Sequence, residues 1–286
     1  MPRRRPCRLV TLTSDLGSAY SAQMKAALVA RGVPPRCILD LAHDLRAHGI
    51  REAAFLLRTM ASSFPAYSVH VAVVDPGVGG RRQPVVVTTR AGPILVGPDN
   101  GVLSLLADEL GFRSAHRIVR SRVGRSSRVG TTFDGRDLFA PAAALVARGT
   151  QPRALGPSTD FARVSIPAPT RRHGSMEGEV VHVDHFGNLI TSLPSAWVSR
   201  GTQSVVLRLG SRRPQRVAWA TSYEALGRGM LGALASSFGL VEIAVSEGRA
   251  SDRLRAGTGT RVALASSVRA VGSRQTIYGR RPRKRE

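Results

Sequence analysis

The chain of 286 residues contains few cysteines, few aromatic residues and almost no lysine. Its two cysteines, Cys7 and Cys37, form neither a metal-binding motif nor a disulfide framework. Aromatic residues make up only 5% of the sequence, and no apolar run approaches the roughly 20 residues that span a bilayer. The N-terminus is basic but lacks the apolar stretch of a signal peptide. These absences exclude a disulfide scaffold and predict a cytoplasmic protein without membrane association.

Lys25 and Lys284 are the only lysines among the 42 basic residues, so arginine supplies nearly all of the positive charge. The formal net charge is +23. Such a charge is typical of nucleic-acid-binding proteins. Here, however, the arginines are scattered, and no helix-turn-helix, zinc or RNA-recognition motif is present. Only the two ends are densely basic. We expect residues 1–8 and 273–286 to be solvated tails that bind polyanions weakly and non-specifically.

Strand and helix patterns alternate over residues 9–165. β-Branched runs at 69–74 and 85–89 predict strands, whereas the apolar spacing at 21–31 and 50–62 predicts helices. Strands that alternate with helices favour an α/β domain in which helices flank both faces of a central sheet.

The alternation of strand and helix patterns ends at a linker. We place this linker at 166–175, at the end of a stretch rich in Pro, Ser, Thr and Arg. Residues 176–272 contain short strand signals between glycine-containing turns, and the helical signal is limited to a piece near 231–236. This pattern predicts a smaller, mostly β C-terminal domain, either a barrel or a sandwich.

A glycine-rich loop follows the apolar run at 69–74 and contains Asp75 and Arg82. A carboxylate and a guanidinium in a loop at the end of a strand are typical of α/β active sites. Taken alone, the same residues describe a tight turn with a surface ion pair. The rest of the chain favours the functional interpretation, because four further motifs occur in a fixed order.

These motifs are Leu-Thr-Ser-Asp-Leu-Gly at 12–17, Val-Gly-Pro-Asp-Asn-Gly-Val at 96–102, Thr-Thr-Phe-Asp-Gly-Arg-Asp at 131–137, and Asp-His-Phe-Gly-Asn-Leu-Ile-Thr at 184–191 with a later run at 236–244. With them, the chain closely resembles the S-adenosylmethionine (SAM) hydroxide adenosyltransferase family over about 9–264. Members of this family hydrolyse SAM to adenosine and methionine and are related to the fluorinase and chlorinase. The resemblance implies an N-terminal α/β domain and a C-terminal β domain, and neither a cofactor nor a metal.

The resemblance also implies a homotrimer in which SAM lies between the N-terminal domain of one subunit and the C-terminal domain of its neighbour. In this family's pattern, Asp15 matches the carboxylate that accepts hydrogen bonds from both ribose hydroxyls, and Thr132 lies close to the ribose. Asp184 and Ser237 match the residues that hold the methionine amino-acid group, with Asp184 paired to its ammonium.

The adenine-binding residues follow from the same resemblance. Asn188 matches the asparagine that reads the base edge, and Phe186 matches a ring that stacks on adenine. Tyr223 is a candidate for the second face of the base. Taken singly, Phe186 and Tyr223 are more often core residues than stacking platforms.

Asp75 and Arg82 match two members of the family's catalytic Asp-Arg-His set. The implied reaction is substitution at the ribose C5′ by water, and no general acid is needed because methionine leaves as a neutral thioether. The expected histidine is replaced by Asp134, which would repel Asp75 unless Arg82 lies between them or one carboxyl is protonated. Three outcomes are open. Asp134 acts as the base, Asp75 and Arg82 suffice at a reduced rate, or the chain binds SAM or adenosine and turns SAM over poorly.

A SAM-dependent halogenase is the less favoured alternative. Asp75 would repel a halide in a desolvated pocket. Gly135 stands where a halide-contacting serine is expected, and only Ala91 and Gly92 occupy the position of the fluorinase's extra loop. Water or hydroxide is therefore the better nucleophile, and we predict a SAM hydrolase.

Overall fold

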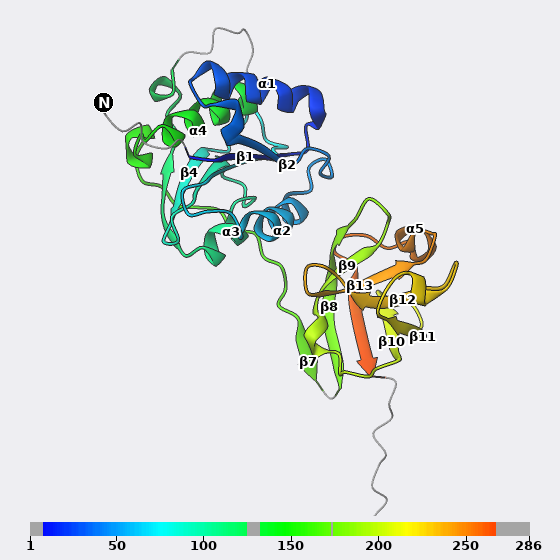
Figure 1. Cartoon of the computed structure of the whole chain (residues 1–286). Coiled ribbons are helices and arrows are strands. Elements are labelled where there is room, and N and C mark those ends of the chain that lie inside the picture. The colour runs from blue at the N-terminus through cyan, green and yellow to red at the C-terminus, as the bar shows by residue number, and fades with distance from the viewer. Residues whose placement is uncertain (1–7, 125–131, 173, 267–286) are drawn as a thin grey trace, which may run out of the picture. The chain divides into compact units, whose positions relative to one another are not determined.

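The computed structural model describes residues 8–124, 132–172 and 174–266, and the chain divides into two compact units, Met1–Pro167 and Ala168–Glu286 (Figure 1). Each unit is described by itself. The predicted basic tails lie outside the described residues, apart from Arg8, and so does Thr131, the first residue of the motif at 131–137. None of the helices in the described ranges is both long and apolar enough to cross a bilayer.

The N-terminal unit is built on a six-stranded mixed sheet with the strand order β2-β1-β3-β5-β4-β6. Its strands are β1 (Val10–Ser14), β2 (Ile38–Ala42), β3 (Val69–Val73), β4 (Pro84–Thr89), β5 (Ile94–Pro98) and β6 (Phe112–Arg117). Strands β2, β1, β3 and β5 are parallel, whereas β4 runs antiparallel to both β5 and β6. The carboxyl ends of the four parallel strands therefore meet at one edge of the sheet, where ligand-binding loops gather in α/β folds.

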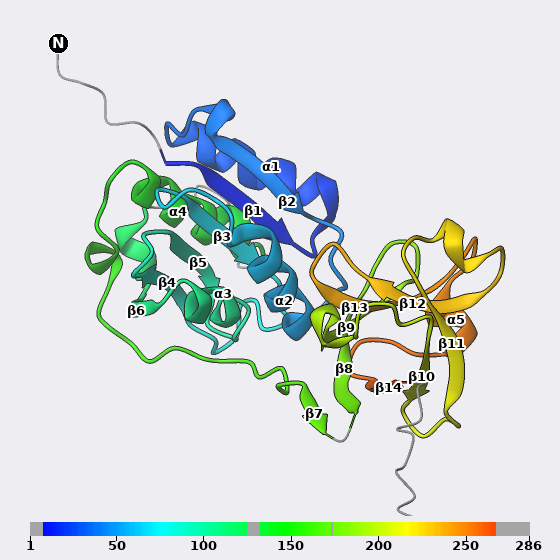
Figure 2. The ribbon, with the colours of Figure 1, turned by 60° about the horizontal axis from the view of Figure 1, so that its bottom comes forward.

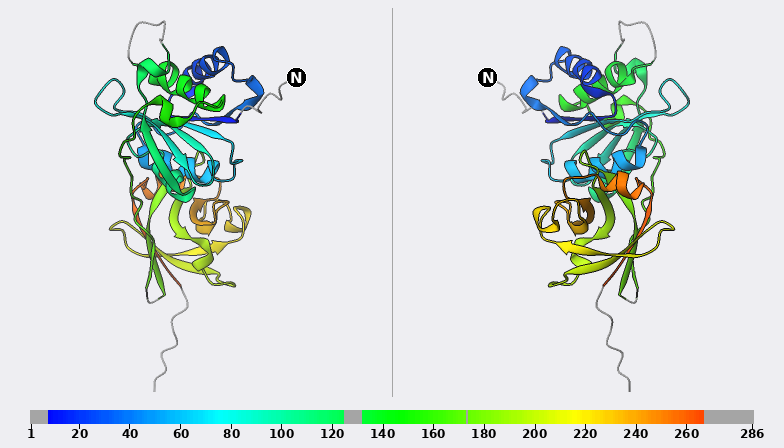
Figure 3. Two further views of the ribbon diagram at one scale, coloured as in Figure 1. Left: turned by 90° about the vertical axis from the view of Figure 1, so that its left-hand side faces the viewer. Right: turned by 90° about the vertical axis from the view of Figure 1, so that its right-hand side faces the viewer.

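Helices cover both faces of this sheet. Helices α1 (Gly17–Ala30) and α4 (Ala140–Ala147) lie on one face, and α2 (Ile50–Ala61) and α3 (Ser104–Glu109) lie on the other (Figures 1 and 3). The side chains of β3 alternate between the two layers, because Val71 and Val73 join the core on the α1 side and Ala72 joins the core on the α2 side. This arrangement confirms the predicted α/β N-terminal domain.

Short helical turns connect these elements. The 3₁₀ turns are η1 (Pro35–Cys37), η2 (Arg120–Arg122), η4 (Pro152–Leu155), η5 (Ser195–Trp197) and η6 (Glu224–Leu226), and η3 (Gly135–Phe139) is a π-helical turn that leads directly into α4. π-Turns are rare and frequently occur at functional sites.

The C-terminal unit is a closed barrel (Figure 2). Its strands are β7 (Thr170–Arg172), β8 (Ser175–Val183), β9 (Leu189–Pro194), β10 (Ser204–Leu209), β11 (Gln215–Ala220), β12 (Leu231–Ala235), β13 (Leu240–Val245) and β14 (Arg261–Ser266), with the helix α5 (Ala250–Leu254). Closure comes from β14, which pairs with β10 on one side and with β8 on the other. All the pairings are antiparallel except that of β11 with β12. The mostly β domain is therefore confirmed, and it is a barrel.

Two local expectations for this unit differ from the structure. The predicted helical piece at 231–236 is wrong, since Leu231–Ala235 is the strand β12 between β11 and β13. Its Leu and Ala residues favour a helix in isolation, but pairing on both sides determines the conformation. A Cβ atom on Gly232 would collide with Leu226, which packs against this strand. The segment 166–175, expected as a linker, contains β7, which pairs with β8.

Candidate active site

Asp75 lies just after β3 and is held by Arg82 from the same loop. The Arg82 Nε atom donates to Asp75 Oδ2 at 2.8 Å, and Nη2 donates to the same oxygen. The motif at 96–102 supports this loop from the side, because the amide of Asn100 donates to the carbonyl of Val74 at 2.9 Å. Gly77 makes room for the arginine stem, since a Cβ there would lie 3.2 Å from Arg82 Cγ. The ion pair is thus positioned by two motifs together.

Asp134 lies on the opposite side of Arg82. It stands at the residue before η3, where its side chain makes no capping hydrogen bond, and its Oδ2 atom accepts from Arg82 Nη2 at 2.5 Å. At the other end of the same π-turn, the Phe139 ring centroid is 5.3 Å from the guanidinium carbon of Arg82. Burial lowers the pKa of Arg82, but its hydrogen bonds and charge contacts with Asp75 and Asp134 outweigh this effect and raise it. Arg82 therefore lies between the two carboxylates, as one of the sequence-based alternatives required.

Arg120 completes this cluster and was not identified from the sequence. Its Nη2 atom donates to Asp134 Oδ1 at 2.6 Å, so that each oxygen of Asp134 accepts from a different arginine. Asp134 and Asp75 are almost fully buried, with 2% and 5% of their side chains exposed. No local pattern marks Arg120 among the many arginines, because its partner is 14 residues away along the chain. Two guanidinium groups thus neutralise two buried carboxylates.

The second oxygen of Asp75 differs from the other carboxylate oxygens of the cluster. Asp75 Oδ1 is buried and accepts no hydrogen bond from any described residue. A buried acceptor without a partner is unfavourable by about 1–3 kcal/mol, which a bound water or ligand donor would relieve. Among the carboxylate oxygens of this cluster, Asp75 Oδ1 is consequently the one that can accept a proton from a bound water without losing a described hydrogen bond.

Asp15 follows β1 at the same edge of the sheet. Its Oδ2 atom accepts from the backbone N–H of His48 at 3.0 Å, and the preceding residue, Ser14, hydrogen-bonds to His43 at 2.8 Å. The other ring nitrogen of His43 lies 2.9 Å from Asp40 Oδ1. Thr132 is exposed two residues before Asp134. Among the described residues, no hydrogen bond or ion pair joins Asp15 or Thr132 directly to Asp75, so their assignment to the ribose stays a prediction.

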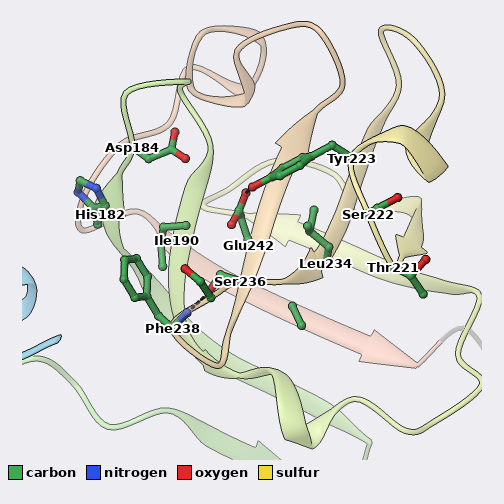
Figure 4. Close-up of a pocket in the computed structure, with 12 residues that line it drawn as sticks. His182, Asp184, Ile190, Thr221, Ser222, Tyr223, Leu234, Ser236, Phe238 and Glu242 are labelled. Atoms are coloured by element: carbon green, nitrogen blue, oxygen red, sulfur yellow. Dashed lines mark hydrogen bonds between the residues drawn. The ribbon is translucent and has the colours of Figure 1, made fainter. Parts of the chain in front are cut away.

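The remaining candidates lie in the C-terminal unit, where Asp184, Tyr223 and Ser237 line one cavity of about 480 Å³ (Figure 4). His182, which the sequence analysis left out of the site, and Glu242 also line it. The lining combines carboxylates, hydroxyls and an apolar floor that includes Ile190 and Leu234. None of the described residues that line this cavity is an arginine or a lysine.

Glu242 is the most deeply buried acid of this cavity, with 3% of its surface exposed. The hydroxyl of Tyr223 donates to Glu242 Oε1 at 2.5 Å. Burial raises the pKa of Glu242, the tyrosine hydrogen bond opposes this shift, and the charge of Asp184 adds to it. Burial and Glu242 together also raise the pKa of Tyr223, so the phenol remains a donor. Sequence reasoning missed Glu242 because it lies within the regular strand β13.

Asp184 is held by the turn between β8 and β9. Its two carboxylate oxygens accept from the backbone and the side-chain amide of Asn188, at 2.8 and 3.0 Å. Asn188 itself is buried and does not line the cavity, whereas Phe186 at the tip of the turn is 71% exposed. In this structure, Asn188 fixes the orientation of Asp184, and the predicted contacts of Asn188 and Phe186 with adenine stay predictions.

Comparison with known proteins assigns the chain to a family. Residues 10–156 match the SAM hydroxide adenosyltransferase N-terminal domain, and residues 178–263 match the C-terminal domain of the same family. The chain therefore belongs to the SAM hydroxide adenosyltransferase family, as its motifs indicated.

Similar proteins include two named "(R)-S-adenosyl-L-methionine hydrolase". The one from Salinispora arenicola is 35% identical, over 86% of this chain and 93% of its own length. The one from Thermus thermophilus is 36% identical, over 86% of this chain and 95% of its own length. A fluorinase from Actinopolyspora mzabensis is more distant, at 25% identity over 68% of this chain and 76% of its own length.

Solved structures agree with this assignment. An uncharacterised conserved protein from Thermotoga maritima superimposes with a TM-score of 0.81 at 29% identity, covering 90% of this chain and all of its own. A conserved hypothetical protein from Thermus thermophilus gives a TM-score of 0.72 at 34% identity, covering 90% of this chain and 99% of its own.

Proposed function

We propose that this protein hydrolyses SAM to adenosine and L-methionine by attack of water at the ribose C5′. The observation that carries the mechanism is the buried Oδ1 atom of Asp75, which accepts no hydrogen bond from the described residues, while Arg82 holds the carboxylate through Oδ2. Family membership and relatives named as SAM hydrolases at 35% and 36% identity support the choice of substrate.

In this mechanism a water molecule donates a hydrogen bond to Asp75 Oδ1 and attacks C5′. A C–O bond forms as the C5′–S bond breaks, the electron pair of that bond goes to sulfur, and the sulfonium becomes a neutral thioether. The proton of the water passes to Asp75. Orientation of the water accounts for part of the acceleration, and a positioned base contributes typically 10²–10⁴-fold.

The barrel cavity supplies the complementary binding groups. Its acids, Asp184 and Glu242, suit the ammonium and the sulfonium of SAM, and Ser237 offers a hydroxyl to the amino-acid group. Tyr223 lines the same cavity and presents a ring to the base. We assign Asp15 and Thr132 to the ribose and Phe186 and Asn188 to adenine on the family pattern.

A halide is a poor nucleophile for this site. The carboxylate of Asp75 would repel it, and position 135 has no space for the serine of a halogenase. A Cβ atom on Gly135 would lie 2.7 Å from a ring carbon of Phe133 and 3.1 Å from the sulfur of Met24. Both observations favour water.

The direct test is incubation of the purified protein with each sulfonium epimer of SAM, with and without chloride, followed by product identification. We expect adenosine and methionine in equal amounts, a preference for the (R) epimer and no chlorinated nucleoside. Asp75→Asn is the matched control, because it keeps the shape of the side chain. Tight SAM binding by the wild-type protein without either product would reduce the proposal to a SAM-binding protein.

We further propose that the enzyme is a cytoplasmic homotrimer that needs no cofactor and completes each site with two subunits. Co-expression of Asp75→Asn and Asp184→Asn chains tests the shared site. Mixed trimers contain sites in which both aspartates are intact, so at SAM concentrations below KM, where each variant alone is slow, the activity of the mixture should exceed that of either variant. Activity no higher than that of either variant alone would contradict a shared site.

A further inference from the structure

We propose that Arg120 is a positioning residue that neutralises Asp134, so that Asp134 acts as a fixed anion behind Arg82 and not as the catalytic base. This inference rests on the proposed hydrolysis and specifies how the chain works without the expected histidine. It assigns the proton-accepting role to Asp75 alone.

The first argument is the distribution of hydrogen bonds. Asp134 uses Oδ2 for Arg82 at 2.5 Å and Oδ1 for Arg120 at 2.6 Å. Protonation of Asp134 would therefore weaken two charge-assisted hydrogen bonds, which are roughly twice as strong as neutral ones. Asp75 keeps one buried oxygen without a described donor, so protonation there breaks no such bond.

The second argument is charge. With Arg82 alone, two buried carboxylates would share a single guanidinium and leave one negative charge uncompensated. An uncompensated buried charge is strongly unfavourable. Arg120 supplies the missing positive charge, and because 53% of its side chain is exposed, its own desolvation is small. Ion pairs between two exposed side chains contribute little to stability. The pair of Arg120 with Asp134 differs from these because Asp134 is buried.

The third argument is the backbone that delivers Arg120. The N–H of Ile118 donates to the carbonyl of Pro84 at 2.8 Å, and the N–H of Val119 donates to the carbonyl of Leu155 at 2.9 Å. The first bond ties the segment of Arg120 to the start of β4, two residues after Arg82. The two arginines therefore reach Asp134 from segments that are joined to each other.

A double-mutant cycle tests the proposal. Because a neutral histidine at position 134 needs no second cation, Arg120→Gln should lower kcat about 10- to 100-fold in the wild-type background and less than about 3-fold in the Asp134→His background. KM should change little, since Arg120 acts through Arg82 on the chemical step. Asp134→Asn serves as a second background if Asp134→His does not fold.

Arg117→Gln is the matched control. Arg117 lines the same cavity as Arg82 and Arg120, but none of the described carboxylates pairs with it. This variant should keep kcat within about 2-fold of the wild type. Arg120→Lys should recover part of the loss, because lysine keeps a positive charge beside Asp134.

Two results would overturn the proposal: an Arg120→Gln enzyme with wild-type kcat, or an equal loss in both backgrounds. A wild-type protein that releases no adenosine would instead defeat the proposed function. The ion-pair inference is then decided by thermal unfolding at neutral pH. Arg120→Gln should lower the unfolding midpoint relative to Arg117→Gln, and the difference should disappear with Asp134→His. A persistent difference would contradict the inference.

Discussion

The two units differ in how the charges of their acidic side chains are balanced. In the N-terminal unit, Asp75 and Asp134 are neutralised by Arg82 and Arg120. In the barrel, Asp184 and Glu242 line one cavity without a described arginine or lysine beside them, and the charge of Asp184 contributes to raising the pKa of Glu242. The first arrangement holds a reactive group in place before substrate binds, whereas the second favours a cationic ligand. The comparison thus distinguishes a cluster that positions a reactive side chain from a cavity that binds a positively charged ligand.

The largest expected effect is that of Asp75→Asn. It removes the proton acceptor but keeps the side-chain shape, so kcat should fall about 10³-fold, within the usual range for loss of a positioned base. KM should change little if the N-terminal cluster serves chemistry and not binding. Steady-state kinetics with SAM measure both constants. A rise in KM at constant kcat would remove the distinction between the two units.

The buried histidine His70 tests whether all buried titratable groups of the N-terminal unit have a charge partner, as Asp75 and Asp134 do. His70 is fully buried, hydrogen-bonds to Thr11 at 2.7 Å, and has its pKa lowered to about 4 by burial. The unfolded chain takes up this proton near pH 6.5, so stability falls as pH decreases from about 6.5 to 4, by about 3 kcal/mol in total.

His70→Gln should remove this part of the pH dependence, because glutamine does not titrate and can still hydrogen-bond to Thr11. Urea unfolding at pH 7, 5.5 and 4.5 measures the slope. If the free energy of unfolding depends on pH equally in the variant and the wild type, His70 has the same pKa in the folded and unfolded states and the prediction is wrong.

Asp184→Asn examines the binding side of the comparison. The variant keeps one acceptor oxygen, for one of the two N–H donors of Asn188, but loses the charge that we assign to the substrate ammonium. KM for SAM should rise roughly 30-fold, which corresponds to about 2 kcal/mol for a lost charge partner, with a small change in kcat. The neutral product adenosine should bind as in the wild type. Equal weakening of SAM and adenosine would point to collapse of the turn.

Glu242→Gln should give the smallest change. The raised pKa of Glu242 means that the folded barrel is more stable when this side chain is protonated. That stabilisation is lost as the pH rises from the pKa of Glu242 in the unfolded chain through its higher pKa in the folded protein, and ionised Glu242 then destabilises the empty barrel. Glutamine removes this penalty, so the empty variant should be more stable at neutral pH. Its affinity for SAM should fall about threefold, in line with the fraction of a kcal/mol that partly screened charge pairs contribute. Calorimetry and denaturant unfolding measure the two effects. A less stable variant would contradict the role of Glu242.

The parts of the site that are close in sequence could be predicted, and those that join distant segments could not. Asp75 and Arg82 lie seven residues apart in one glycine-rich loop, so their pairing follows from local chain geometry. The pairs Asp134–Arg120 and Tyr223–Glu242 span 14 and 19 residues and different elements. Nothing in the residue pattern distinguishes Arg120 from its many neighbours of the same type. Such pairs depend on how the strands are ordered.

Local preference also failed where tertiary pairing dominates. Leu231–Ala235 has a helix-favouring composition, yet it forms the strand β12 because β11 and β13 pair with its two edges. Similarly, the expected linker contains β7, whose conformation depends on its partner β8. Short segments carry too little periodicity to oppose a full set of interstrand hydrogen bonds.

The sequence by itself determined the family, the two-domain α/β and β architecture, and the Asp75–Arg82 pair, because ordered motifs and hydrophobic periodicity are local properties of the chain. Only the tertiary structure decided that Arg82 separates Asp75 from Asp134, that Arg120 balances the second carboxylate, and that Asp184 and Glu242 share a cavity. The physical reason is that charge compensation depends on distance in space. A buried carboxylate is stabilised by whichever cation the fold brings within hydrogen-bond reach, and that cation need not be near it in the sequence.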